Sequence, residues 1–273
     1  MARRHRQNRT RNDKLAGVGL AVVGLALLGA LIAASFWVKT SRIAIDEATN
    51  CPLAGPLAVH AIIIDQSDRI SGQQAQQVRQ LLTKVRRDAA FGTRFDIYTF
   101  EGNATDELHP RLAVCAPGKP EDANELYENP DQIRKTYEEK FARIVDNALD
   151  ALLQTDTLPN SPIIESIRAG SITSFSGAEV SPEHLKLTLI SDMIQNSAHL
   201  SQFRSNAGFE QLSKSPSWPS LRPHLRGAKV RILYLMRPDA ARDGKPIQSR
   251  GHQVFWEELV AASGGTLESF EPL

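Results

Sequence analysis

The chain has 273 residues, of which 41% are hydrophobic and 23% charged, and it carries a formal net charge of +1. This length accommodates one globular domain of roughly 200–230 residues plus an appendage. Its two cysteines form no C-x-x-C pair and lie near no histidine cluster, which argues against a zinc or redox site.

The appendage is the amino-terminal segment. Residues 15–38 are 24 residues without a charge, and at about 1.5 Å per residue a helix of this length spans roughly 36 Å. That is enough to cross a hydrocarbon core of about 30 Å, so the segment predicts a transmembrane helix that contacts the lipid bilayer. The alternatives are a cleaved signal peptide, because residues 30–35 include small side chains near a cleavage position, and a buried core helix.

The orientation of this span follows from its basic flank. Residues 1–14 contain six Arg and Lys residues against Asp13, a net charge of +5. A positive flank stays in the cytoplasm, so we expect a single-pass membrane protein with an exported carboxyl-terminal domain, periplasmic in a bacterium. Topology already explains the charge, and binding of nucleic acid by this tail is the weaker interpretation. In an oxidising compartment Cys51 and Cys115 can form a disulfide, with two buried free thiols as the alternative.

Residues 39–56 are expected to form a linker, and residues 57–273 the exported domain. Hydrophobic periodicity and turn signals predict its elements. In chain order these are a strand at 59–64, a helix at 72–88, a strand at 95–100, an edge strand at 108–114, an amphipathic helix at 133–152, a helix from 163 to about 169 capped by Ser161 and followed by a Gly/Ser-rich loop, strands at 187–191 and 230–235, a helix at 251–262, and an edge strand at 266–270. This alternation predicts an α/β fold with a doubly wound, mostly parallel sheet and helices on both faces.

The first strand carries the most informative pattern. Residues 59–64 are mostly apolar without alternation and lead directly into Asp65 and Ser67, as expected of a central strand buried on both faces. The later strand at residues 187–191 ends in the same way, at Asp192. Ligands of open α/β sheets bind beyond the carboxyl ends of such strands. We therefore expect Asp65, Ser67 and Asp192 to lie together at one rim.

These residues resemble a von Willebrand factor A-like domain, over roughly residues 57–271. That family's metal-ion-dependent adhesion site uses Asp-x-Ser-x-Ser after the first strand, a Thr-Pro in a central loop and an Asp after the fourth strand. The corresponding residues here are Asp65, Ser67, Ser161 and Asp192. The resemblance implies that they bind Mg²⁺ or Mn²⁺, hard cations that prefer oxygen ligands.

The motif departs from the family pattern at its third position. Arg69 stands where a second serine is expected, so it supplies a positive charge and no ligand. Asp68 or Ser71 could take its place as a ligand.

The function implied by the resemblance is a membrane-anchored protein-interaction domain, with a partner's acidic residue completing the ion's shell, in an envelope-associated complex. One alternative is a metal-dependent hydrolase of the phosphatase type, with Asp65 as nucleophile. That site usually has a second carboxylate where Ser67 stands, and the chain has no Gly-rich phosphate loop. The other alternative is a structural domain whose metal site has decayed. We expect a binding module rather than an enzyme, with His60 as a core or sheet-edge residue and an Asp65→Ala variant that keeps its fold.

Overall fold

The computed structural model divides the chain into two compact units, Met1–Ala44 and Ile45–Leu273. It describes residues 22–33, 43–67, 69–100, 108–123, 128–153 and 160–273. In the first unit residues 22–33 are helical, and the rest of the predicted span at 15–38 lies outside the described residues, as does the basic tail. Within the part of the chain that is described, no helix is both long and apolar enough to cross a membrane.

The second unit is built on a six-stranded sheet with the strand order β3-β2-β1-β4-β5-β8. All neighbouring strands are parallel except β3, which runs antiparallel at one edge. The strands are β1 (Ala58–Asp65), β2 (Thr93–Phe100), β3 (Leu112–Cys115), β4 (Leu185–Ser191), β5 (Lys229–Tyr234) and β8 (Thr266–Pro272), and a separate hairpin joins β6 (Ala241–Arg242) to β7 (Lys245–Pro246). The predicted mostly parallel α/β sheet is confirmed, with β1 and β4 side by side at its centre.

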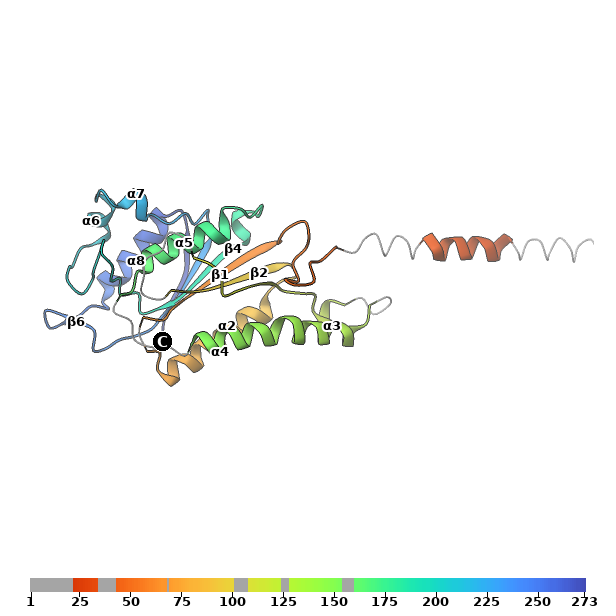
Figure 1. Cartoon of the computed structure of the whole chain (residues 1–273), viewed down its shortest axis with the longest axis horizontal. Helices are drawn as coiled ribbons and strands as arrows, with labels where there is room; N and C mark the ends of the chain where they lie inside the picture. Colours follow the sequence, from red (N-terminus) through yellow and green to blue (C-terminus); the bar gives the residue numbers. More distant parts are fainter. Residues whose placement is uncertain (1–21, 34–42, 68, 101–107, 124–127, 154–159) are drawn as a thin grey trace, which may run out of the picture. The chain divides into compact units, whose positions relative to one another are not determined.

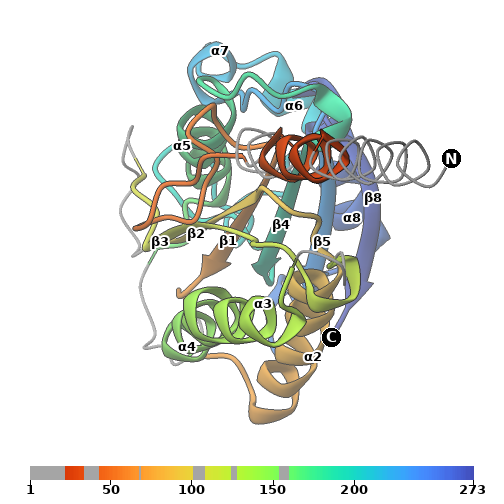
Figure 2. The same ribbon diagram turned by 90° about the vertical axis from the view of Figure 1, so that its right-hand side faces the viewer.

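Helices cover both faces of this sheet (Figures 1 and 2). One layer contains α2 (Gly72–Asp88), α3 (Pro130–Tyr137), a π-helical segment (Glu138–Ala142) and α4 (Arg143–Leu152). The other contains α5 (Ile163–Phe175), the short helices α6 (Phe209–Ser213) and α7 (Trp218–Leu221), and α8 (Arg250–Ala262). Side chains of β1 alternate between the two cores: Ile62 and Ile64 pack with the first layer, whereas Ala61 and Ile63 pack with the second. This is why the strand is apolar throughout.

The helix after β1 begins where the sequence predicts. Ser71 caps α2 by accepting a hydrogen bond from the Gln74 backbone N–H, and the Gln74 side chain accepts one from the Ser71 N–H. This reciprocal pair stabilises the first turn of the helix.

The helix at Ser161 differs from the prediction in two ways. Pro162 is the N-cap residue of α5, and Ser161 does not cap the helix with its side chain. The helix also continues to Phe175 through the predicted Gly/Ser loop. Gly170 lies against β1, where an added Cβ would come within 2.9 Å of the Ile63 side chain. The glycine therefore serves close helix–sheet packing rather than a turn.

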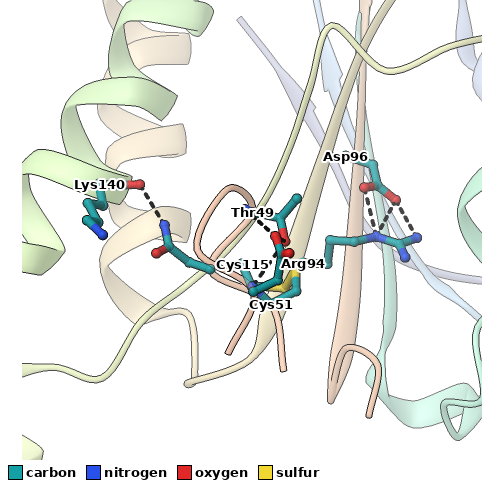
Figure 3. The surroundings of a disulfide bond; sticks show 8 residues. Thr49, Cys51, Arg94, Asp96, Cys115 and Lys140 are labelled. Atoms are coloured by element: carbon teal, nitrogen blue, oxygen red, sulfur yellow. Dashed lines mark hydrogen bonds and ion pairs between the residues drawn. A yellow bond between two sulfur atoms is a disulfide. The ribbon is translucent and has the colours of Figure 1, made fainter. Parts of the chain in front are cut away.

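A disulfide joins Cys51 to Cys115, with their Cα atoms 4.8 Å apart, as predicted (Figure 3). It ties the segment before β1 to the edge strand β3. Backbone contact supports the same connection, because the Cys115 N–H donates to the Thr49 carbonyl at 2.8 Å. The Asn50 side chain donates to the Lys140 carbonyl at 3.0 Å. Residues 45–56, predicted as a linker, thus contact the sheet and the helical layer.

Candidate functional site at the carboxyl edge of the sheet

Asp65, the last residue of β1, is the centre of a buried polar cluster. One carboxylate oxygen, Oδ1, accepts a hydrogen bond from the Ser67 backbone N–H at 2.8 Å. The other, Oδ2, accepts from Ser161 Oγ at 2.9 Å and Ser191 Oγ at 2.7 Å. Three chain segments that are far apart in sequence thus meet on one carboxylate. The structure thus brings Asp65, Ser67 and Ser161 together at this edge.

Burial determines the charge balance at Asp65. The residue is only 4% exposed, and burial raises the pKa of its carboxyl group, while hydrogen bonds from Ser67, Ser191 and Ser161 act in the opposite direction. The three donors stabilise the ionised form, because hydrogen bonds to a carboxylate favour its charge. Burial is the larger effect, so the pKa of Asp65 is raised, and the hydroxyl and amide dipoles offset only part of the cost of burying its charge.

The remaining residues of the first motif lie differently. Ser67 is buried, and its Oγ has no hydrogen-bond partner among the described residues. Ser71 is exposed and already engaged as the cap of α2. Arg69 is exposed, and Asp68 lies outside the described residues. Ser67 is thus the motif residue with a buried oxygen available to a ligand.

Asp192 lies at the same edge but faces a different group. It follows Ser191, the last residue of β4, and is 3% exposed. Its Oδ1 accepts a hydrogen bond from the Ile194 N–H at 2.8 Å, and its Oδ2 lies 3.6 Å from Nε of Arg237. Arg237 also donates to the Gln74 side chain at 3.2 Å. A guanidinium therefore balances the charge of Asp192.

Sequence reasoning missed several members of the cluster. Ser191 precedes Asp192 in the predicted strand and could have been recognised from the Ser-Asp pair at its end. Glu165, in the first turn of α5, accepts a hydrogen bond from the Gln195 side chain at 2.9 Å through Oε2. Its Oε1 is buried with no partner among the described residues. No local sequence pattern around Glu165 or Arg237 predicts that either residue lies at this edge of the sheet.

The donor set fits a hard cation in part. Within the described ranges no three His, Cys, Asp or Glu side chains are grouped to hold a metal, so an ion at this edge would depend on hydroxyl ligands. The unpartnered Oγ of Ser67 and the cluster of Asp65 and Ser161 offer such oxygens, which suit Mg²⁺. Asp192 fits less well, since Arg237 already supplies a positive charge beside it.

A hollow of about 380 Å³ opens in the loop between β4 and α6. Backbone hydrogen bonds of 2.9 Å in both directions between Ser161 and Asn196 connect this loop to the Asp65 cluster. Its lining includes His199 and Arg204, both exposed, and no acidic residue. Phe203, beside Arg204, is 42% exposed. The hollow therefore contains the cation Arg204, and the loop that forms it is bonded through Asn196 to Ser161, a hydrogen-bond donor to Asp65.

Comparison with known proteins finds weak structural similarity only. No family model matches the chain, and no curated protein matches it significantly. An aerotolerance-related membrane protein from Bacteroides fragilis is similar at 11% identity and a TM-score of 0.37, over 78% of this chain and 92% of that one. Three N-terminal domains of the type V pili tip protein Mfa5 from Porphyromonas gingivalis are similar at 15% identity and a TM-score of 0.29, over 51% of this chain and 20% of that one. The TFIIH p34 N-terminal domain is similar at 12% identity and a TM-score of 0.28, over 78% of this chain and 90% of that one. Similarities at this level carry no functional inference.

Proposed function

We propose that this protein is a membrane-anchored binding module with a von Willebrand factor A-like domain, whose carboxyl edge binds an acidic side chain of a partner protein in an envelope-associated complex. The observations that carry the proposal are the meeting of three chain segments on Asp65 and an acid-free hollow in the loop that Asn196 joins to Ser161. Arginine and aromatic residues are enriched at protein interfaces, and Arg204 and Phe203 stand exposed at this place.

The disulfide supports the proposed location of the domain. Disulfides persist in oxidising compartments and are rare in the cytosol, and the Cys51–Cys115 bond closes a loop of 64 residues. An uncharged stretch at residues 15–38 behind a basic flank would anchor such a domain with its carboxyl terminus outside the cytoplasm. A carboxyl-terminal alkaline phosphatase fusion should be active and a cytoplasmic reporter fusion inactive. The reverse pattern would refute the orientation.

The metal-dependent form of the proposal assigns Mg²⁺ or Mn²⁺ to Asp65, Ser67 and Ser161, with a bound acidic side chain of the partner as a further ligand. Such an ion would provide a positive charge that attracts the partner's carboxylate. The chain's own residues would orient it: Asp65 supplies the negative charge, and its hydrogen bonds with Ser161 and Ser191 fix the position of its carboxylate.

The hydrolase alternative has less support. Both oxygens of Asp65 accept hydrogen bonds, and the residue is buried. A carboxylate nucleophile must reach its substrate, and Asp65 is only 4% exposed. A screen of the full chain against phosphate monoesters and esters tests this directly, and activity lost with Asp65→Asn would replace the binding proposal.

Partner binding can be tested by purifying the full chain from its native membrane after cross-linking. The wild type should capture a defined protein, and the exchange Arg204→Glu should abolish capture, because it places a negative charge against an acidic partner. Arg222→Glu, an equally exposed arginine outside the hollow, is the matched control and should retain capture. Equal capture by all three proteins would refute a binding surface at this edge.

Metal binding can be tested by thermal unfolding of the full chain in detergent with Mg²⁺, Mn²⁺ or a chelator. A ligand at a hundredfold excess over its Kd stabilises the folded state by about 2.7 kcal/mol, so the ions should raise the melting temperature. Arg69→Ser restores the third motif position and should enlarge the shift, while Ser67→Ala should reduce it. If the ions shift the melting temperature of neither the wild type nor Arg69→Ser, the metal-dependent form is refuted and a metal-independent binding surface remains.

A further inference from the structure

The opposite, amino-terminal edge of the sheet contains a cavity of about 450 Å³. It is lined by the first residues of β1, β4 and β5, by the last turns of α2, by the turn Pro182–His184 and by Glu268 of β8. The cavity lies on the sheet face that carries α2, and its volume is in the range of sites for small molecules, about 300–1,000 Å³.

Cationic side chains converge on this cavity from three elements. Lys84 comes from α2, Lys186 from β4, and Lys229 and Arg231 from β5. In the parallel pairing of β4 with β5, Lys186 lies directly beside Lys229, and Arg231 lies beside Thr188 one rung further along the same face. Neighbouring strands are only about 4.8 Å apart, and like charges placed opposite each other destabilise a sheet.

The acidic residues of the lining do not compensate these lysines. Glu268 lies 3.6 Å from Arg231, which also contacts Glu271 at 3.5 Å. Glu183 lies 4.0 Å from His184 on the exposed turn, and Asp88 is at the end of α2. Among the described residues Lys84, Lys186 and Lys229 form no ion pair. The two adjacent lysines thus place like charges side by side, without an ion pair among the described residues to offset their repulsion.

The floor of the cavity is polar and uncharged. His60 of β1 lies beside Lys186 in the register of β1 and β4, and its Nε2 is 2.8 Å from Thr188 Oγ1. Burial lowers the pKa of His60 to about 3, helped by the charges of Lys186 and Arg231. The imidazole is therefore neutral near pH 7. A neutral floor below several ammonium groups is suited to an anion that carries oxygen acceptors on several sides.

We propose that this cavity binds a phosphorylated ligand, with its phosphate group between Lys186 and Lys229. Lysine ammonium groups bind phosphate as compact point charges, and a phosphate dianion can contact more than one of them at once. Two sources supply this chemistry, a soluble phosphorylated metabolite and the headgroup of an anionic phospholipid. The site is separate from the carboxyl edge, and it does not depend on the proposed partner binding.

Calorimetric titration of the full chain in detergent with inorganic pyrophosphate tests the soluble source. Native mass spectrometry of the same sample with added phosphatidylglycerol tests the lipid source. Binding of either probe should weaken at least tenfold in the double variant Lys186→Gln/Lys229→Gln. The control Lys214→Gln/Lys245→Gln removes the same charge from the residue after α6 and from β7, outside the cavity, and should bind like the wild type.

The outcomes distinguish the two ligand sources from each other and also test whether the cavity binds a phosphate group at all. Pyrophosphate binding that is lost in the cavity variant identifies a soluble ligand, and phosphatidylglycerol binding lost in that variant identifies a lipid headgroup. Failure of the wild type to bind either probe, or equal weakening by the control variant, would overturn the proposal. The cavity variant should also melt no lower than the wild type without a ligand, because it removes a repulsion. A lower melting temperature would show that the lysines stabilise the fold, contrary to the repulsion that motivates the site.

Discussion

The two edges of the same sheet treat charge in opposite ways. At the carboxyl edge, the carboxylates of Asp65 and Asp192 are buried and surrounded by hydroxyl, amide and guanidinium donors. At the amino edge, Lys186 and Lys229 stand exposed, side by side and without an ion pair among the described residues. The carboxyl edge pairs its buried carboxylates with donors of the protein itself, whereas Lys186 and Lys229 at the amino edge have no ion pair among the described residues.

This difference shows what burial requires. A buried carboxylate must be hydrogen-bonded or paired, or its desolvation destabilises the fold, so the carboxyl edge had to assemble its donors from several segments. Exposed ammonium groups keep their water and can stay unpaired at little cost. Changes at the carboxyl edge should therefore affect stability as well as binding, while changes to the lysines of the amino edge should affect binding alone.

Each edge has one buried neutral histidine, and both should make the fold less stable in acid. The pKa of His60 is lowered to about 3 and that of His252 to about 4, in both cases mainly by burial. Unfolded histidine titrates near 6.5, so between pH 6.5 and pH 4 the unfolded state binds more protons. Stability should be complete above pH 6.5 and decrease as the pH falls, the largest effect that we expect. The raised pKa of Asp65 works in the opposite direction. Denaturant titrations of the full chain from pH 7.5 to pH 4 measure this slope.

Variants of the two histidines show how much each contributes to the pH dependence of stability. His60→Gln and His252→Gln should each flatten it, whereas His184→Gln, on an exposed residue, should leave it unchanged. If both buried-site variants keep the wild-type slope, these histidines do not cause the acid sensitivity.

Breaking the disulfide tests the amino edge, where Cys115 pairs with Arg94 near the start of β2. A loop of 64 residues corresponds in the chain-entropy model to about 4 kcal/mol of stabilisation, as an upper figure. The variant Cys51→Ser/Cys115→Ser should unfold at correspondingly lower denaturant concentration. Reduction of the wild type should reproduce the loss, and reduction of the variant should have no effect. Loss of much less than 1 kcal/mol would mean that the contacts of Thr49 and Asn50 hold this segment without the bond.

The sequence predicts the sheet better than the site, for a physical reason. The apolar run of β1 and the Ser71–Gln74 capping box are local signals, and both elements form where expected. Ser-Pro at a helix start is also a local signal and predicts that Ser161 caps the helix, but its hydroxyl bonds a carboxylate 96 residues away in the chain. The contact of Asp192 with Arg237 and the pairing of Lys186 with Lys229 depend on tertiary placement and strand register. No local pattern encodes either.

Asp65 offers a test of the balance at the carboxyl edge. The sequence suggests that Asp65→Ala leaves the fold intact, but the burial of the residue and its three donors predict otherwise. Each buried donor left without an acceptor costs about 1–3 kcal/mol, so Asp65→Ala should lose roughly 3 kcal/mol of unfolding free energy. Asp65→Asn keeps one acceptor oxygen and should lose less. Chemical denaturation compares the two, and equal stability of Asp65→Ala and the wild type would contradict a closely bonded carboxylate.

The last test concerns Arg237, and it sharpens the contrast between the two edges. Its contact with Asp192, at 3.6 Å, is longer than a good hydrogen bond, but Asp192 is buried, so Arg237→Gln should cost about 3 kcal/mol of stability, the low end of the range for breaking a buried pair. The same exchange removes a positive charge beside a buried carboxylate. Mg²⁺ should therefore raise the melting temperature of Arg237→Gln more than that of the wild type. Arg242→Gln, whose side chain bonds the Gln202 and Ser205 carbonyls rather than a carboxylate, should respond to Mg²⁺ like the wild type. If Arg237→Gln gains no response to the ion, the guanidinium is not what limits cation binding, and the carboxyl edge is then balanced by hydroxyls and amides in the neighbourhood of Asp65 without any need for a metal.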